Sequence, residues 1–222
     1  MVNLTIVDID ISEHDLIGNG TCTVGQTCRI GQAEVTITAV PCNDNEIQVR
    51  YPATAEFRDA YKGLWIFDGI ANQLISGYHS YPDEGSAIES ASCTTSTPVC
   101  NRENIFNIML SQTRFIAPTD EINPVEHCKI TNLDIPGIPA GDDPIRTTVD
   151  RATYSVTNYT RYDHALHSGR VTRRLIERDG FIIIDTSGEG FGILPFVNNL
   201  AAPSLLKNQV DAGLIQAVQE TL

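Results

Sequence analysis

Lysine is scarce in this sequence of 222 residues: it supplies 3 of the 15 basic residues, and arginine supplies the other 12. The 28 acidic residues bring the formal net charge to −13. A chain this acidic repels polyanions as a whole, which excludes duplex nucleic acid as a general partner. Long apolar runs are also missing. None approaches the roughly 18 residues of a membrane-spanning helix, so we expect no membrane insertion.

The sequence also lacks the short motifs of the common catalytic classes. It has no G-x-S-x-G, no H-E-x-x-H and no P-loop, and no cysteine is placed as a nucleophile. The glycine-rich "DTSGEGFG" (185–192) is followed by too few residues for a nucleotide-binding unit, so we interpret it as a turn that leaves a hairpin. Acidic stretches such as "CNDNE" (42–46) lack the alternating spacing of a calcium loop. These absences predict no cofactor and no metal, and they favour a non-enzymatic protein.

Cysteine, by contrast, is present as an even set of six. Two pairs are local, with five and six residues between the cysteines, whereas metal and redox C-x-x-C motifs have two. The simplest connectivity is Cys22–Cys28, Cys93–Cys100 and, by elimination, Cys42–Cys128. Unpaired buried thiols are one alternative. The other alternative is a metal site that includes His127 and Cys128, although no second cluster of cysteine and histidine has matching spacing.

Disulfides predict an extracellular or otherwise oxidising compartment. The first residues contain no basic segment followed by an apolar core, so no signal peptide is expected in this sequence. Three routes stay open: a leader that was removed, a domain taken from a longer exported protein, or leaderless export followed by oxidation. In the loop-entropy model the long bridge contributes about 4.5 kcal/mol and a short one about 2.5 kcal/mol.

Alternation of apolar and polar residues predicts a mainly β fold, sandwich- or barrel-like, with a few helices. "AEVTITAV" (33–40) is an expected strand. "RVTRRLIERDGFIIIDT" (170–186) is an expected β-hairpin, because Asp179-Gly180 is a type I′ turn signal. An apolar residue recurs every fourth position near the end of the chain, which predicts an amphipathic C-terminal helix packed on that hairpin. Its members are Leu206, Val210, Leu214 and Val218.

Two segments break these patterns. Residues 79–101 are polar and rich in Ser, Thr, Pro and Gly, so we predict a surface loop used for contacts and tethered by a disulfide. "IPGIPAGDDP" (135–144) is the best linker candidate. We therefore divide the chain into a disulfide-tethered β-rich region, 1–140, and a region with the β-hairpin and the C-terminal helix, 141–222. The second region is either a separate domain or part of the same one.

The stretch 161–178 is unusually basic, because it holds five of the twelve arginines. Guanidinium groups match the oxygens of phosphate and carboxylate bidentately, so this stretch is a candidate anion site. The residues expected to bind the anion are Arg170, Arg173, Arg174 and Arg178. His164 and His167 are candidate general acid and base for phosphodiester cleavage. The alternative is that these arginines pair with acidic residues on an exposed face of the hairpin.

Two functions of different class follow from these patterns. The first is a non-enzymatic, exported structural or binding subunit of an extracellular, surface or virion assembly, which contacts copies of itself or other protein subunits. The second is a secreted effector or hydrolase that acts on a phosphate-containing substrate through the 161–178 patch. Self-association near neutral pH favours the first, and a monomer that binds phosphate favours the second.

Three intramolecular disulfides are a prediction that mass spectrometry tests directly. Alkylation of the denatured chain without reduction should leave its mass unchanged, and alkylation after reduction should add six labels, because every cysteine is expected to be paired. Labelling of all six cysteines before reduction would remove the argument for an oxidising compartment.

Overall fold

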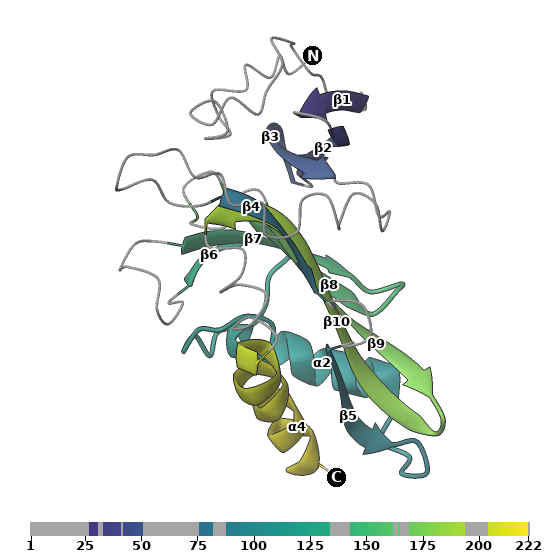
Figure 1. Ribbon diagram of the computed structural model, residues 1–222. Helices are drawn as coiled ribbons and strands as arrows, with labels where there is room; N and C mark the ends of the chain where they lie inside the picture. Colours follow the sequence, from purple (N-terminus) through teal and green to yellow (C-terminus); the bar gives the residue numbers. More distant parts are fainter. Residues whose placement is uncertain are drawn as a thin grey trace.

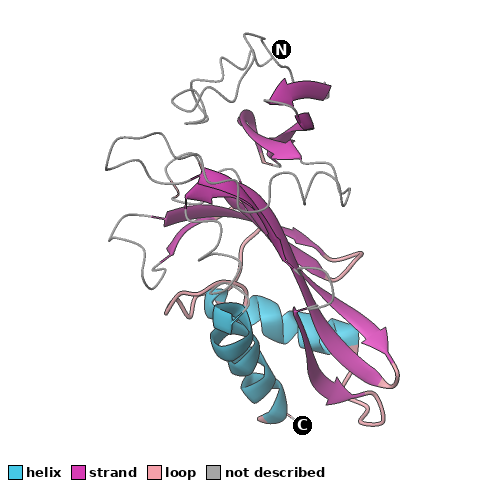
Figure 2. Cartoon of the chain, in the orientation of Figure 1, coloured by secondary structure: helices cyan, strands magenta, loops and turns pink. Residues whose placement is uncertain are grey.

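The part of the protein that the structure describes contains two antiparallel sheets and a small set of helices (Figures 1 and 2). The computed structural model describes residues 27–30, 33–40, 42–50, 76–81, 88–133, 143–161, 164, 169–193 and 204–221. The expectations for Cys22, with its bond to Cys28, and for His167 lie outside the described residues. Most of the linker candidate 135–144 also lies outside them.

The smaller sheet has three strands in chain order. They are β1 (Thr27–Ile30), β2 (Ala33–Val40) and β3 (Asn43–Arg50). Strand β2 spans the residues that alternation predicted. Cys42, immediately before β3, has a φ of 76°, in the left-handed region where a non-glycine residue is uncommon.

The larger sheet has seven strands in the order β4-β10-β9-β8-β7-β6, and β5 also pairs with β10. The strands are β4 (Ser76–Tyr81), β5 (Ile88–Thr94), β6 (Ile130–Leu133), β7 (Asp143–Asp150), β8 (Ser155–Thr160), β9 (Gly169–Arg178) and β10 (Phe181–Ile193). All pairs are antiparallel. The boundary proposed at residue 140 falls between β6 and β7, which are neighbours in this sheet.

The hairpin of β9 and β10 confirms the strongest local prediction from the sequence. Asp179 and Gly180 have φ angles of 52° and 77°, and a type I′ turn requires positive φ at both central residues. The turn fixes the register, since Phe181 lies opposite Arg178 and every later pair is equally far from the turn.

Two predicted irregular segments are strands, and those predictions were wrong. The supposed loop 79–101 contains part of β4 and all of β5, and among its described residues turns and bends are found at 95–99, ahead of α2. The supposed turn 185–192 continues β10, which pairs with β4 from Gly188 to Ile193. The local sequence of these segments does not favour strands, since glycine has low intrinsic strand propensity. The pairing of β10 with β4, β5 and β9 accounts for their conformation.

Helices lie on one side of the lower part of the large sheet in Figure 1. They are α2 (Arg102–Ser111), the short η3 (Thr113–Phe115), the π-helical segment η4 (Leu206–Asp211) and α4 (Ala212–Gln219). Among these elements, no helix is long and apolar enough to cross a membrane.

The core lies between these helices and the sheet. Leu214 and Val218 of α4 belong to one buried cluster with Leu175, Ile182 and Ile184 of the hairpin. All four members of the predicted apolar stripe are buried. A mainly β fold with a few helices and a C-terminal helix packed on the hairpin is therefore confirmed.

Two of the expected disulfides are present. Cys93 and Cys100 join the end of β5 to the residues before α2, with Cα atoms 6.0 Å apart, and both are part of the core cluster. Cys42 and Cys128 are 5.6 Å apart at Cα and join residues that are 86 positions apart in the sequence.

Gly213 gives a test of the helix packing. A Cβ atom at this position in α4 would lie 3.7 Å from the ring of Phe115, an ordinary van der Waals distance. Gly213→Ala should therefore raise the free energy of unfolding by about 0.5–1 kcal/mol, because alanine loses less backbone entropy in a helix. Urea denaturation measures the change. Gly180→Ala is the matched control and should destabilise the protein, because the φ of Gly180 is 77°.

Candidate functional site

Strand β9 places the predicted arginines on two opposite faces of the sheet. Successive side chains of a strand point to alternate sides, and Arg173 and Leu175 are fully buried on the side of the helices. Arg170, Arg174 and Arg178 therefore lie on the other side. We call this side the outer face, and only three of the four predicted anion ligands share it.

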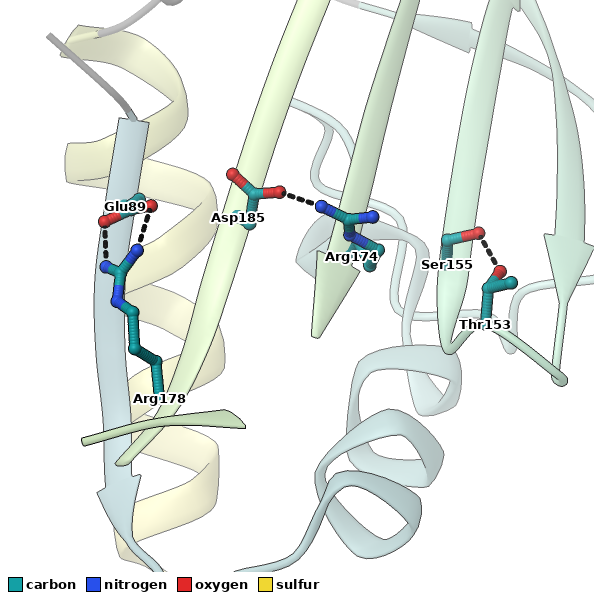
Figure 3. A network of polar contacts seen from close by, with 6 residues as sticks. All are labelled: Glu89, Thr153, Ser155, Arg174, Arg178 and Asp185. Carbon is teal, nitrogen blue, oxygen red and sulfur yellow. Dashed lines mark hydrogen bonds and ion pairs between the residues drawn. The ribbon is translucent and has the colours of Figure 1, made fainter. Parts of the chain in front are cut away.

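Each outer-face arginine contacts a carboxylate on β10 or on β5, the strand beyond it. Arg170 lies 2.6 Å from Glu189, its partner in the ladder, and Arg174 lies 2.9 Å from Asp185, also its partner. Arg178 reaches past β10 and donates through both terminal nitrogens to Glu89 on β5. Figure 3 shows the last two pairs in front of the strands, with helices behind. The arrangement matches the alternative in which the arginines pair with acidic residues.

Hydrogen bonding from Arg178 is the largest influence on Glu89 and lowers its pKa. Partial burial opposes this shift, and the positive charge of Arg178 lowers the pKa by a lesser amount. A lowered carboxyl pKa means that the contribution of the pair to stability is present at neutral pH. It is lost as the pH falls below the ordinary range of glutamate and through the lowered pKa. Half of the Arg178 side chain is exposed, so salt also weakens this pair.

Arg173 takes part in a different kind of contact, inside the protein. Its Nη2 donates to Asp211 Oδ1 at 2.5 Å, and both side chains are fully buried. The hydroxyl of Ser90, on β5, donates to Asp211 Oδ2 at 2.5 Å. Both carboxylate oxygens are thus used, and the contact joins β5, β9 and the end of the π-helical segment. We call Ser90, Arg173 and Asp211 the buried triad.

The buried triad leaves several polar atoms unsatisfied. Within the described part of the chain, nothing accepts a hydrogen bond from Nε or Nη1 of Arg173. The hydroxyl of Thr186, the residue opposite Arg173 on β10, also has no partner there. An unpaired buried donor costs about 1–3 kcal/mol. The unpaired atoms therefore lower the stability of the folded protein. Sequence patterns did not predict the triad.

His164, one of the two candidate catalytic histidines, is buried. Its Nδ1 lies 3.7 Å from Oδ1 of Asp143, at the start of β7, and the two side chains are 2% and 6% exposed. That distance is longer than a hydrogen bond. A catalytic role for His164 stays a prediction, as does anion binding by the outer-face arginines.

A groove of about 500 Å³ lies between the C-terminal helix and the residues that follow η3. Its walls are mixed, with Arg114, Asp120 and Glu220 as charged residues and Val210 and Ala217 as apolar ones. It contains none of the predicted site residues, and opposite charges on its walls favour no single ligand charge.

Comparison with known proteins finds only distant likeness. No protein-family model matches the sequence, and no curated protein does. Norcoclaurine synthase from Thalictrum flavum aligns with a TM-score of 0.39 and 11% identity, over 67% of this chain and 87% of that one. Ara h 8.0201 gives 0.38 and 14% over 65% and 97%, and Zhui aromatase/cyclase from Streptomyces sp. R1128 gives 0.37 and 10% over 67% and 93%. Likeness at this level carries no inference about activity.

Removing one member of the buried ion pair should destabilise the protein strongly. Asp211→Leu leaves the charge of Arg173 buried and uncompensated, which should cost about 3–5 kcal/mol. Arg173→Met should cost a similar amount, and the double variant should cost much less than the sum. Urea denaturation of the four proteins measures the coupling.

Arg174→Met is the control for this cycle. Its side chain is 52% exposed and paired at the surface, so its loss should cost about 0–1 kcal/mol. Additive effects of the two buried substitutions would show that Arg173 and Asp211 do not depend on each other.

Proposed function

We propose that this chain is a non-enzymatic subunit of an extracellular or surface assembly, and that it contacts copies of itself or other protein subunits through the outer face of the β9–β10 hairpin. The pairing of all three outer-face arginines carries the proposal. Three positive and three negative groups alternate over this face, so it has a pattern of charge but no net charge from these groups. Such a pattern suits a complementary protein surface, where charges fix register and exclude wrong partners.

The same pairing argues against a phosphate-binding enzyme. A phosphate that entered this face would compete with Asp185, Glu89 and Glu189 for guanidinium groups they already hold. The burial of His164 acts in the same direction, because a general acid or base must come within hydrogen-bond reach of its substrate.

The disulfides support the extracellular or surface location in this proposal. The two bonds seen in the described part are compatible with an oxidising compartment, where such bonds persist. Secretion and self-assembly belong to the proposal itself.

A charge-swapped variant tests the proposed surface. Arg174→Asp with Asp185→Arg keeps the cross-strand pair within the chain but reverses the two charges that a partner meets. The unmodified protein should sediment above its monomer mass of 24.3 kDa near neutral pH, and the swapped variant should sediment as a monomer with unchanged stability. High salt should also dissociate the unmodified protein, because salt screens the charges at the proposed contact.

Two results would contradict the proposal. One is a swapped variant that associates as well as the unmodified chain. The other is a monomer that binds inorganic phosphate at low salt, hydrolyses a phosphodiester and loses binding in the variant Arg174→Gln. The second result would establish the effector alternative.

A further inference from the structure

The two described disulfides lie in contrasting surroundings. Cys93 and Cys100 are 8% and 2% exposed and form part of the core. Cys42 is exposed, and Cys128 is half-buried. Thiol–disulfide exchange requires a thiolate to reach a sulfur atom from outside. Of these two bonds, the one between Cys42 and Cys128 offers that access in the folded protein.

A histidine lies beside the accessible bond, and its hydrogen bonds indicate its neutral tautomer. The backbone N–H of Val149 donates to Nδ1 of His127 at 3.0 Å, so Nδ1 is an acceptor. In a neutral imidazole the other nitrogen then carries the hydrogen. That nitrogen, Nε2, lies 3.7 Å from the sulfur of Cys42, within the range of an N–H···S contact. His127 is therefore oriented to donate to Cys42.

We propose that the Cys42–Cys128 bond is a thiol-exchange site, open to a small thiol of the glutathione class, with Cys42 as the leaving group. The incoming thiolate attacks Sγ of Cys128, a new S–S bond forms, and the Cys42–Cys128 bond breaks. The electron pair goes to Sγ of Cys42, where the N–H of His127 stabilises the thiolate. A hydrogen bond to the thiolate makes a cysteine a better leaving group.

A second thiolate of the same class completes the reaction. It attacks the sulfur of the first thiol in the mixed disulfide, and Cys128 leaves as a thiolate. The two small thiols are then joined in a disulfide, having supplied two electrons, and both cysteines are reduced. No other oxidant or reductant takes part.

The same three residues invite a metal interpretation, and the tautomer argues against it. The two sulfur atoms and one ring nitrogen of His127 lie within 4.8 Å of one another, so the reduced site would offer three ligand atoms. A metal at Nε2 needs the lone pair of that nitrogen and moves the hydrogen to Nδ1. That change would break the bond from Val149. Exchange chemistry keeps this bond intact.

Opening the bond would release a long-range tether. Cys42 immediately precedes β3, and Cys128 lies two residues before β6, an edge of the large sheet. The bond is thus a covalent link between the small sheet and the large one. The inference does not depend on the proposed function.

Treatment of the intact, folded protein with glutathione at neutral pH tests the proposal. The reaction is stopped with acid, free thiols are alkylated, and the peptides are mapped by mass. The first product should carry glutathione on Cys128 and a free thiol on Cys42. The Cys93–Cys100 bond should stay closed until denaturant is added, and so serves as an internal control. Glutathione found mainly on Cys42, or equal opening of both bonds, would overturn the proposal.

Variants at His127 separate donation from a structural role. His127→Ala should slow formation of the Cys128 adduct by about three- to tenfold, because the leaving group loses its donor. His127→Gln should restore much of the rate, since its amide nitrogen can reach the position of Nε2. Unfolding midpoints of the variants are measured alongside. An unchanged or faster rate in His127→Ala would refute the role of His127.

Discussion

The ion pair between Arg173 and Asp211 determines how the end of the chain meets the sheet. The apolar stripe of the C-terminal helix repeats every four residues, so a slide of one turn would still bring apolar residues to the core. Asp211 occurs once and meets a single buried cation. A misplaced helix would leave both charges buried without a partner, at a cost of about 3–5 kcal/mol for each broken pair. The pair thus constrains the position of the helix in a way that the repeating apolar stripe does not, and we expect this constraint to set the position at which the core packs.

Sequence patterns predicted those elements whose signals are local. The hairpin followed from Asp179-Gly180, strand β2 from strict alternation, and the C-terminal helix from its stripe. Strands β4 and β5 gave no such signal, because β10, their partner, lies about a hundred residues away in the sequence. The glycine-rich half of β10 gave none either, because glycine has low strand propensity and its conformation depends on pairing with β9 and β4. Register within the hairpin was readable in principle. Arg174 and Asp185 are equally far from the turn, and so are Arg170 and Glu189.

The candidate site was predictable to a lesser degree. Alternation along β9 separates Arg173 from Arg174, but it does not say which arginine faces the core. The answer depends on Asp211, 38 positions later, and on Ser90 in a segment without strand signals. Arginine is also mostly exposed in folded proteins, so composition predicts a surface position for Arg173. The basic stretch thus contains surface arginines that are paired with carboxylates and one buried arginine, Arg173. Composition alone does not distinguish the two kinds.

The position of β10 in the chain has a consequence for synthesis. This strand of 13 residues pairs with β9 along one edge and with β5 and β4 in succession along the other (Figure 1). Within the described part, β10 is the partner through which β4 and β5 join the sheet. A ribosome makes the chain from its N-terminus, so β4 and β5 emerge about a hundred residues before the strand that pairs with them. During that interval the backbone groups of β4 and β5 lack their hydrogen-bonding partners on β10, and unpaired strand edges are prone to aggregation. Such a nascent chain gains more from a holding chaperone than one whose sheet forms in order of synthesis.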